Sequence, residues 1–306
     1  NLETKQLKKA EGHFQLAHML HQEGELMAAK EEYERCLQIA PMHVTANHML
    51  MVVNAYYDDI DDTDIKEKND NDSSGSSNAD SYKIANPGYV EMLFDSYAST
   101  YEKHMIEKLL YRVPHLIVDE MKKQLMSSEK TSLLDLGCGT GLIAKLYKKN
   151  ILNDIHIVGV DMSSLMIDQA KDHYDILIQD DIENYLKKQK ELQSVEQKDY
   201  KYFDGIAIGD VFGYIGDLQS VIEGAHHILA KNGGKLIFTI EESDHILPNG
   251  YLLDIETSRF VHDVNYIHRI LKRNNKFNIL VEREVILRYQ MRNPVKGVLF
   301  VCERNS

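Results

Sequence analysis

The chain of 306 residues contains no tryptophan and only three cysteines. Cys36, Cys138 and Cys302 are too few and too scattered for a disulfide framework or for the paired spacing of a zinc site. Free cysteines are typical of a reducing compartment, so we expect a cytoplasmic protein without a metal site. The first residues, from Asn1, lack the basic start and apolar core of a secretion signal, and whether a segment precedes Asn1 stays open.

Long apolar runs and positive charge are also missing. No apolar run approaches the ~18 residues that cross a bilayer. Lys and Arg number 35 against 48 Asp and Glu, which gives a formal net charge of −13. Nonspecific binding to nucleic acid or to an anionic membrane requires a basic surface, so we expect neither partner. The acidity favours a small-molecule, peptide or protein substrate.

Glycine is scarce, with 17 residues in the chain, yet three glycines follow one apolar run closely. Residues 133–136 read as a strand, the glycines at 137, 139 and 141 as a turn, and the next residues as a helix. Asp161 ends a second apolar run, 155–160. Glycines let the backbone turn tightly and let a ligand approach its amides. This pattern predicts a site for a cofactor that carries a nucleoside.

The spacing of the motif indicates which cofactor. A dinucleotide fingerprint would place its third glycine at position 142, which is Leu142. The pattern here is G-x-G-x-G with Asp135 two residues ahead, which is the form that binds S-adenosylmethionine, and Asp161 would accept hydrogen bonds from both ribose hydroxyls. A glycine-rich turn of another α/β protein is the alternative, and Asp135, Asp161 and the second strand weigh against it.

The N-terminal region has apolar and small residues at helical spacing over 10–41, interrupted near Gly24 and closed by Pro41. This spacing predicts a helical hairpin. It resembles one tetratricopeptide (TPR) repeat, although His13 stands where the repeat often has tryptophan. The matching positions are Leu16, Ala17, Leu20, Gly24, Ala29, Tyr33, Cys36 and Pro41. Residues 42–57 would begin a second repeat. We expect a TPR-like region over 1–57 for partner or substrate binding or for dimerisation; a plain hairpin that caps the main domain is the alternative.

Residues 58–83 are rich in Asp, Asn and Ser and have almost no large apolar residues, so they predict a flexible linker. Asp70, Asp72, Ser74 and Gly75 copy the opening of a calcium loop. However, Ser81 stands where the closing acid should be, and no helix is expected to lead in. We therefore interpret the segment as linker.

Residues 84–306 alternate predicted strands with helices, which favours a doubly wound, mostly parallel sheet. Two β-rich runs, 277–289 and 296–303, are joined by the turn residues 291–294 and predict an antiparallel hairpin at one edge. The parallel strands are expected at 132–136, 155–160, 174–179, 203–208 and 235–240. This is the layout of an α/β, Rossmann-like class I methyltransferase with a seven-stranded sheet.

Further stretches make the resemblance to class I methyltransferases more specific, and the chain is similar to bacterial methyltransferases that carry N-terminal TPR repeats. The stretches are Tyr89-Val90-Glu91-Met92-Leu93-Phe94-Asp95-Ser96-Tyr97-Ala98, Tyr101-Glu102-Lys103-His104, Tyr111-Arg112-Val113-Pro114, residues 209–218, and Ser258-Arg259-Phe260-Val261-His262 with Tyr266. The long linker and the short repeat region depart from that family.

The resemblance implies contacts with S-adenosylmethionine, whose product is S-adenosylhomocysteine. Tyr97 would donate to the cofactor's carboxylate, Met162 and Ile182 would contact adenine, and Asp181 would accept from the adenine amino group. The full set implied at the cofactor is Tyr97, Asp135, Gly137, Cys138, Gly139, Gly141, Asp161, Met162, Asp180, Asp181, Ile182 and Asp210.

Methyl transfer from a sulfonium is an in-line displacement, so the enzyme mainly aligns the acceptor and excludes water. A hydroxyl or ammonium acceptor also needs a base. The candidates for this role are His104, His262 and Asp210, although each histidine could instead be a surface or packing residue and Asp210 could be a helix cap or loop carboxylate.

The sequence therefore predicts a methyltransferase that uses S-adenosylmethionine and acts at O or N of a small metabolite or a protein side chain. The alternative is a TPR interaction protein whose cofactor fold serves as a scaffold or sensor without turnover.

Overall fold

The computed structural model describes residues 2–66, 82–125, 130–150, 154–194 and 202–305. They divide into two compact units. The helical unit comprises Asn1–Val90 together with Leu252–Phe260, and the sheet unit comprises Glu91–Tyr251 together with Val261–Ser306. The division thus falls at Val90 rather than near residue 84. The inclusion of 252–260 in the helical unit was not predicted, because contacts between distant segments leave no mark on local sequence patterns.

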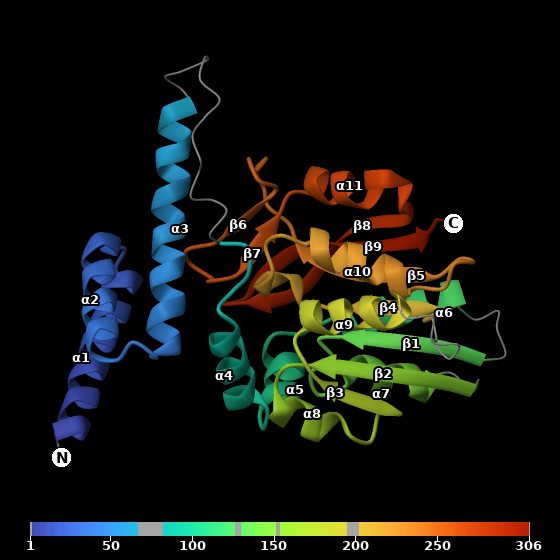
Figure 1. Cartoon of the computed structure of the whole chain (residues 1–306), viewed down its shortest axis with the longest axis horizontal. Coiled ribbons are helices and arrows are strands. Elements are labelled where there is room, and N and C mark those ends of the chain that lie inside the picture. The colour runs from blue at the N-terminus through green and yellow to red at the C-terminus, as the bar shows by residue number, and fades with distance from the viewer. Residues whose placement is uncertain (1, 67–81, 126–129, 151–153, 195–201, 306) are drawn as a thin grey trace. The chain divides into compact units, whose positions relative to one another are not determined.

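The helical unit begins with α1 (Leu2–Gln22), α2 (Leu26–Ile39) and α3 (Val44–Lys66) (Figure 1). Gly24, at φ 81°, makes the turn between α1 and α2, so the predicted helical hairpin is confirmed. Its core consists largely of small side chains, which let the helices approach closely: Ala10, Ala17, Ala29, Tyr33, Cys36, Ala46 and Val53. Leu16, in contrast, is 46% exposed. The TPR identity of this hairpin stays a prediction.

The linker predicted from residue 58 is wrong for its first part, because α3 continues to Lys66. Helix propagation adds one hydrogen bond for each residue fixed, so a helix with a packed first half can extend into a polar stretch. Residues 67–81, which include the calcium-loop-like segment, lie outside the described residues.

The sheet unit contains a seven-stranded sheet in the order β3-β2-β1-β4-β5-β9-β8 (Figure 1). Neighbouring strands from β3 to β5 are parallel, whereas β9 is antiparallel to both β5 and β8. The predicted class I methyltransferase fold, with its mostly parallel sheet and antiparallel edge hairpin, is therefore confirmed. The strands are β1 (Lys130–Leu136), β2 (Asp154–Asp161), β3 (Ile176–Gln179), β4 (Gly205–Ile208), β5 (Lys235–Glu241), β8 (Phe277–Gln290) and β9 (Asn293–Arg304).

Helices cover both faces of this sheet (Figure 1). Helices α6 and α7 pack against each other, and α10 contacts both α9 and α11. Two short strands, β6 (Tyr251–Leu253) and β7 (Phe260–His262), form a separate pair that the sequence did not reveal. The helices are α4 (Pro87–Tyr97), α5 (Tyr101–Lys103), η2 (His104–Lys108), α6 (Val113–Leu125), α7 (Leu142–Asn150), α8 (Ser164–Ala170), α9 (Ile182–Ser194), η3 (Phe212–Tyr214), α10 (Gln219–Ile228), α11 (Val264–Lys272) and η4 (Arg273–Asn275).

The edge hairpin of β8 and β9 turns more tightly than predicted. Only Met291 and Arg292, at φ 48° and 69°, form the turn, because Asn293 already pairs with Gln290. The pairing of β8 with β9 shifts register between Ile279 and Val281 and again between Ile286 and Arg288. Such bulges bend an edge strand and re-aim its side chains.

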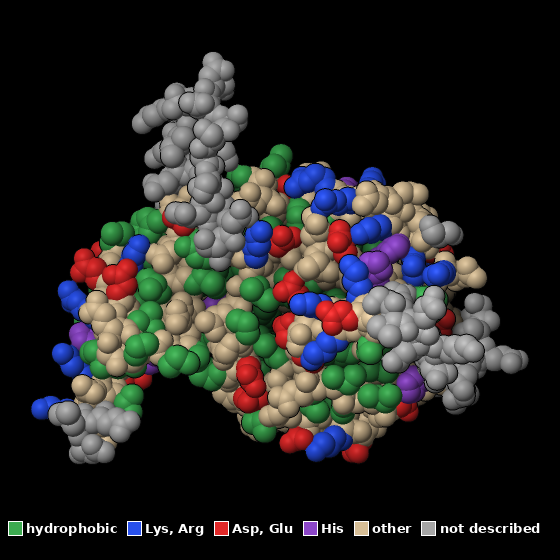
Figure 2. Space-filling view, in the orientation of Figure 1, with side chains coloured by type: hydrophobic (Ala, Val, Ile, Leu, Met, Phe, Trp, Pro, Cys, Tyr) green, Lys and Arg blue, Asp and Glu red, His purple; other side chains and the backbone are tan. Residues whose placement is uncertain are grey.

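Within the described ranges, no helix is long and apolar enough to cross a membrane. On the face of the sheet unit visible in Figure 2, Lys and Arg side chains are interspersed with Asp and Glu and form no continuous basic stripe among the residues shown in colour. The cytoplasmic location stays a prediction.

Candidate active site

The turn between β1 and α7 holds its three glycines at positive φ. Gly137, Gly139 and Gly141 have φ values of 74°, 53° and 89°, which L side chains rarely adopt. The Gly137 amide donates to the Val160 carbonyl at 2.8 Å, which closes the turn onto β2. A Cβ on Gly137 would lie 2.3 Å from Val211 Cγ2, whereas a Cβ on Gly139 would meet nothing within 4 Å. Gly139 therefore leaves its backbone open to a ligand.

Asp161, the last residue of β2, connects this turn to the start of α8. Its Oδ2 accepts from the Gly139 amide at 2.8 Å and its Oδ1 accepts from the Ser163 amide at 2.9 Å. Burial raises the pKa of Asp161, and the backbone hydrogen bonds act in the opposite direction. The carboxylate is thus held in one orientation beside the open glycine. Its contact with the ribose stays a prediction.

Asp135 lies in β1 immediately before the turn and is 2% exposed. Its Oδ2 accepts a 2.6 Å hydrogen bond from the Tyr174 hydroxyl, and its Oδ1 is buried without a partner among the described residues. Burial raises the pKa of Asp135 to about 7. Burial likewise raises the pKa of the adjacent Cys138 thiol, so this thiol is neutral. Sequence reasoning missed Tyr174 as a site residue.

The residues predicted at adenine follow β2 and β3. Asp181 precedes α9, and its Oδ1 accepts from the Asn184 amide at 3.0 Å as a helix cap. Burial alone would raise the pKa of Asp180, but hydrogen bonds from Lys188 and Asn184 outweigh it and the pKa is lowered. Ile182 is buried. The Met162 carbonyl accepts from Gln179 Nε2 at 3.3 Å. The adenine contacts of these residues stay predictions.

Helix α4, predicted to cover the methionine end of the cofactor, is attached to the site through a residue that sequence reasoning missed. Asp95 Oδ1 accepts from the Ser163 hydroxyl at 2.5 Å and from the Leu165 amide at 3.4 Å. Ser163 is also the N-cap of α8. Tyr97, at the end of α4, is 38% exposed, and its ring centroid lies 5.4 Å from that of His104. The Asp95 contact therefore joins α4 to the strand end that carries Asp161.

We expect Asp95→Ala to speed amide hydrogen exchange in residues 91–97 by about tenfold, because a partly buried hydrogen bond to a carboxylate contributes roughly 1–2 kcal/mol to local stability. Mass spectrometry of the exchanged peptides measures the effect. Glu91→Ala, an exposed acid on the same helix, is the control and should leave the exchange unchanged. Equal exchange in Asp95→Ala and the parent protein would show that this contact does not hold α4.

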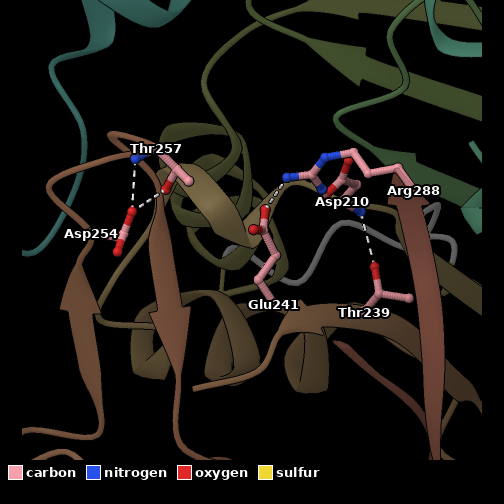
Figure 3. Close-up of polar contacts among 6 residues, drawn as sticks. All are labelled: Asp210, Thr239, Glu241, Asp254, Thr257 and Arg288. Atoms are coloured by element: carbon pink, nitrogen blue, oxygen red, sulfur yellow. Dashed lines mark hydrogen bonds and ion pairs between the residues drawn. The ribbon is translucent and has the colours of Figure 1, made fainter. Parts of the chain in front are cut away.

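Asp210 follows β4 and takes part in a buried cluster at the carboxyl ends of two strands (Figure 3). Its Oδ1 pairs with Arg288 Nη1 at 3.0 Å, and Arg288 Nη2 pairs with Glu241 Oε1 at 2.7 Å. The Asp210 amide donates to the Thr239 hydroxyl at 3.1 Å. Arg288 and Glu241 are each 5% exposed. Asp210 is thus a paired loop carboxylate, and the cap of η3 is Val211 instead.

Arg288 and Glu241 were not predicted as site residues. Glu241 ends β5, and its position at a strand terminus is a signal that could have been used. Arg288 gives no such signal, because in a strictly alternating strand it would lie on the other face of the sheet from its buried neighbour Leu287 and would be exposed. In the structure Leu287 and Arg288 are both buried, next to the register shift between Ile286 and Arg288.

His262 is fully buried in β7, and its Nε2 lies 3.0 Å from the Ile215 carbonyl and 3.1 Å from the Gly216 carbonyl. Since both partners accept, Nε2 carries the proton. Burial lowers the pKa of His262 to about 4, so the ring is neutral near pH 7. This environment favours an anchor for the loop after β4, and the base role stays a prediction.

His104 begins η2, a turn of π-helix in which the Leu109 amide donates to the His104 carbonyl at 3.1 Å. Its Nδ1 is buried without a partner in the described part of the chain. Turns of this type are frequent at functional sites. The structure therefore places Asp135 and Asp161 at the ends of β1 and β2 beside the glycine turn, Asp210 in a separate charged cluster after β4, and His104 next to Tyr97. The roles of these residues stay predictions.

Comparisons with known proteins show what this chain is similar to. Residues 134–236 match the model of a family described as a methyltransferase domain. Ubiquinone biosynthesis O-methyltransferase from Coxiella burnetii is 32% identical over 109 residues, which are 35% of this chain and 42% of that enzyme. An uncharacterized protein from Methanocaldococcus jannaschii is 27% identical over 176 residues, which are 57% of this chain and 74% of that protein.

Among solved structures, a SAM-dependent methyltransferase from Methanosarcina mazei matches with a TM-score of 0.45 and 16% identity, over 61% of this chain and 97% of that chain. The chain spans less than half the length of the Coxiella enzyme, 42%. Residues 134–236 thus carry a methyltransferase domain, and the predicted cofactor, S-adenosylmethionine, is confirmed. The acceptor and the role of the helical unit do not follow from these matches.

Proposed function

We propose that this chain moves the methyl group of S-adenosylmethionine to an oxygen or nitrogen of a small metabolite or a protein side chain. The observation that carries the proposal is the pair of carboxylates, Asp135 and Asp161, fixed beside an open glycine turn at the carboxyl ends of β1 and β2. Ligands of such sheets bind at this edge. We call Asp135, Gly139 and Asp161 the cofactor cradle. That these residues are all present supports turnover rather than a degenerate cofactor fold.

The cradle fits the cofactor in shape and chemistry. Gly139 leaves space where a Cβ would stand, and the buried Asp135 Oδ1 requires a hydrogen-bond donor. Asp161 would accept from the ribose hydroxyls, Met162 and Ile182 would contact adenine, and Tyr97 would donate to the cofactor's carboxylate. When bound, the cofactor supplies an already activated methyl group.

The chain's own work is then to align the acceptor and exclude water. An acceptor would approach at the carboxyl ends of β4 and β5. Asp210 follows β4, Glu241 ends β5, and Arg288 of β8 pairs with both of these carboxylates. A hydroxyl or ammonium acceptor must lose a proton, and Asp210 or His104 would take it. The likeness to an O-methyltransferase makes hydroxyl compounds the first acceptors to test.

The second candidate is an interaction protein in which the cofactor fold is a scaffold or sensor without turnover. The helical unit supports it, because α1, α2 and α3 enclose a core of their own. In either case we propose that this unit binds a protein partner or substrate or mediates dimerisation. Mixing chains of two lengths and testing for co-elution would report dimerisation directly.

Incubation of the purified protein with methyl-labelled S-adenosylmethionine and fractionated lysate distinguishes the two candidates. We expect label in a small-molecule or protein fraction, and no label with Asp161→Ala. Saturable cofactor binding without transfer to any fraction would favour the scaffold. Retention on immobilised RNA at moderate salt would contradict the expectation that nucleic acid is not a partner.

A further inference from the structure

The surroundings of Asp135 are built to receive one particular side chain. Asp135 is paired in register with Gly159 of β2 on one side and Ala207 of β4 on the other. A glycine inside a strand weakens it and often marks a place where another group must approach closely. At Gly159, a Cβ would lie 2.8 Å from Leu177 Cδ2 and 2.9 Å from two ring carbons of Tyr174, so the glycine makes room for both side chains.

A second glycine accommodates the same ring from the cofactor turn. A Cβ on Gly141 would lie 3.1 Å from Tyr174 Cε2. The ring of Tyr174, which is 8% exposed, therefore fits against two glycines, and its hydroxyl reaches Asp135 Oδ2 at 2.6 Å. A hydrogen bond this short to a carboxyl group is among the stronger kinds. The contact fixes which oxygen of Asp135 stays available.

The oxygen of Asp135 that Tyr174 does not contact is suited to bind a cation. Asp135 Oδ1 is buried and has no partner among the described residues. The titratable groups that face Asp135 in that part of the chain are Tyr174, Asp161 and Cys138, and none of them is a cation. Burial and the neighbouring Asp161 raise the pKa of Asp135 to about 7, against the hydrogen bond from Tyr174. Without a ligand, Asp135 is therefore partly protonated near neutral pH.

We infer that Tyr174 is a positioning residue of the cofactor site: it holds Asp135 so that Oδ1 receives the α-ammonium of the cofactor, and this ammonium displaces the proton of Asp135 into solvent. The inference rests on the proposed function. The direction of the pH dependence of cofactor affinity follows from the carboxyl group of Asp135, because the ammonium binds only to its carboxylate form. Cofactor affinity should therefore rise with pH and level off above about pH 7, and it should fall by up to about tenfold for each unit below.

Isothermal titration in two buffers of different ionisation enthalpy counts the protons released. S-adenosylhomocysteine, which retains the α-ammonium, is the ligand, and 5′-methylthioadenosine, which lacks the amino-acid end, is the control ligand. We expect release of nearly one proton per S-adenosylhomocysteine at pH 6 and almost none at pH 8. We expect none for methylthioadenosine at either pH.

Tyr174→Phe keeps the ring and removes the hydroxyl that stabilises the carboxylate. We expect about tenfold weaker binding of S-adenosylhomocysteine at pH 7, unchanged binding of methylthioadenosine, and proton release that now persists at pH 8. Tyr147→Phe removes the hydroxyl of another buried tyrosine, 2% exposed, in the same unit, and should behave as the parent protein. Asp135→Asn should abolish the release altogether.

The possible failures are distinguishable. If S-adenosylhomocysteine binds without proton release and with the same affinity at pH 6 and pH 8, this inference is wrong while the proposed function stands. If Tyr174→Phe weakens both ligands equally, Tyr174 serves packing only and the inference is again overturned. If neither S-adenosylmethionine nor S-adenosylhomocysteine binds at any pH, the proposed function itself fails.

Discussion

Replacement of Asp161 by alanine should weaken S-adenosylmethionine binding by at least about 100-fold. The variant would lose the acceptor proposed for both ribose hydroxyls, and a hydrogen bond to a charged group contributes about 1.5–3 kcal/mol. It would also release the Gly139 and Ser163 amides, which the carboxylate now holds at 2.8 and 2.9 Å. The glycine turn would then lose its fixed position relative to β2. Titration calorimetry with the purified variant measures the affinity.

A matched control separates binding from folding. Asp168→Ala removes an acid seven positions further on, in α8, whose partner is the exposed Lys171 at 2.7 Å. Exposed ion pairs contribute about 0–1 kcal/mol, so this variant should bind the cofactor normally. Circular dichroism should show both variants folded. Near-normal affinity in a folded Asp161→Ala would refute the ribose role and with it the cradle on which the proposed function rests.

Replacement of Arg288 by methionine should lower the free energy of unfolding by about 3–5 kcal/mol, because it leaves two buried carboxylates without the guanidinium that they share. The distances to Asp210 and Glu241 are 3.0 and 2.7 Å, and the side chains of all three residues are at most 10% exposed. Methionine keeps the volume of the side chain, so the loss would reflect charge rather than a cavity. Urea denaturation monitored by circular dichroism measures the change.

Arg283→Met on the same strand is the control. Arg283 pairs with Glu120 at 3.3 Å, but its side chain is 47% exposed and Glu120 also bonds Lys123 at 2.8 Å. We expect a loss of less than about 1 kcal/mol there. Equal losses in the two variants would mean that the cluster at Arg288 contributes no more than a surface ion pair.

Much of the sheet unit could be predicted because its signals are local. Apolar runs predict buried strands, and the expected strands agree with all seven strands of the large sheet to within a few residues. The hairpin of β8 and β9 was recognisable from its turn residues. The end of α3 and the short strands β6 and β7 were not, because a polar helix extension and a three-residue strand carry no periodic signal.

The cofactor set was found for the same reason. The spacing of Gly137, Gly139 and Asp161 along the chain is characteristic of a cofactor turn, so these residues can be recognised from the sequence without the fold. Asp95 and Tyr174 act from other segments, 68 and 39 positions away from their partners. Their importance lies in contacts that only folding creates.

The methyl donor was recognisable from the local pattern, through a glycine turn that only certain backbone conformations can form and an acid at the end of the next strand. Which oxygen of Asp135 stays available depends instead on the folded arrangement, because Tyr174 must fit against Gly141 and Gly159. The folded arrangement also determines the partners of Asp210, since next to the bulge in β8 Arg288 is buried together with Leu287 and against the alternation of the strand. The physical reason is the same in both cases: burial and pairing of charge depend on neighbours brought together by the fold, and no local pattern encodes them.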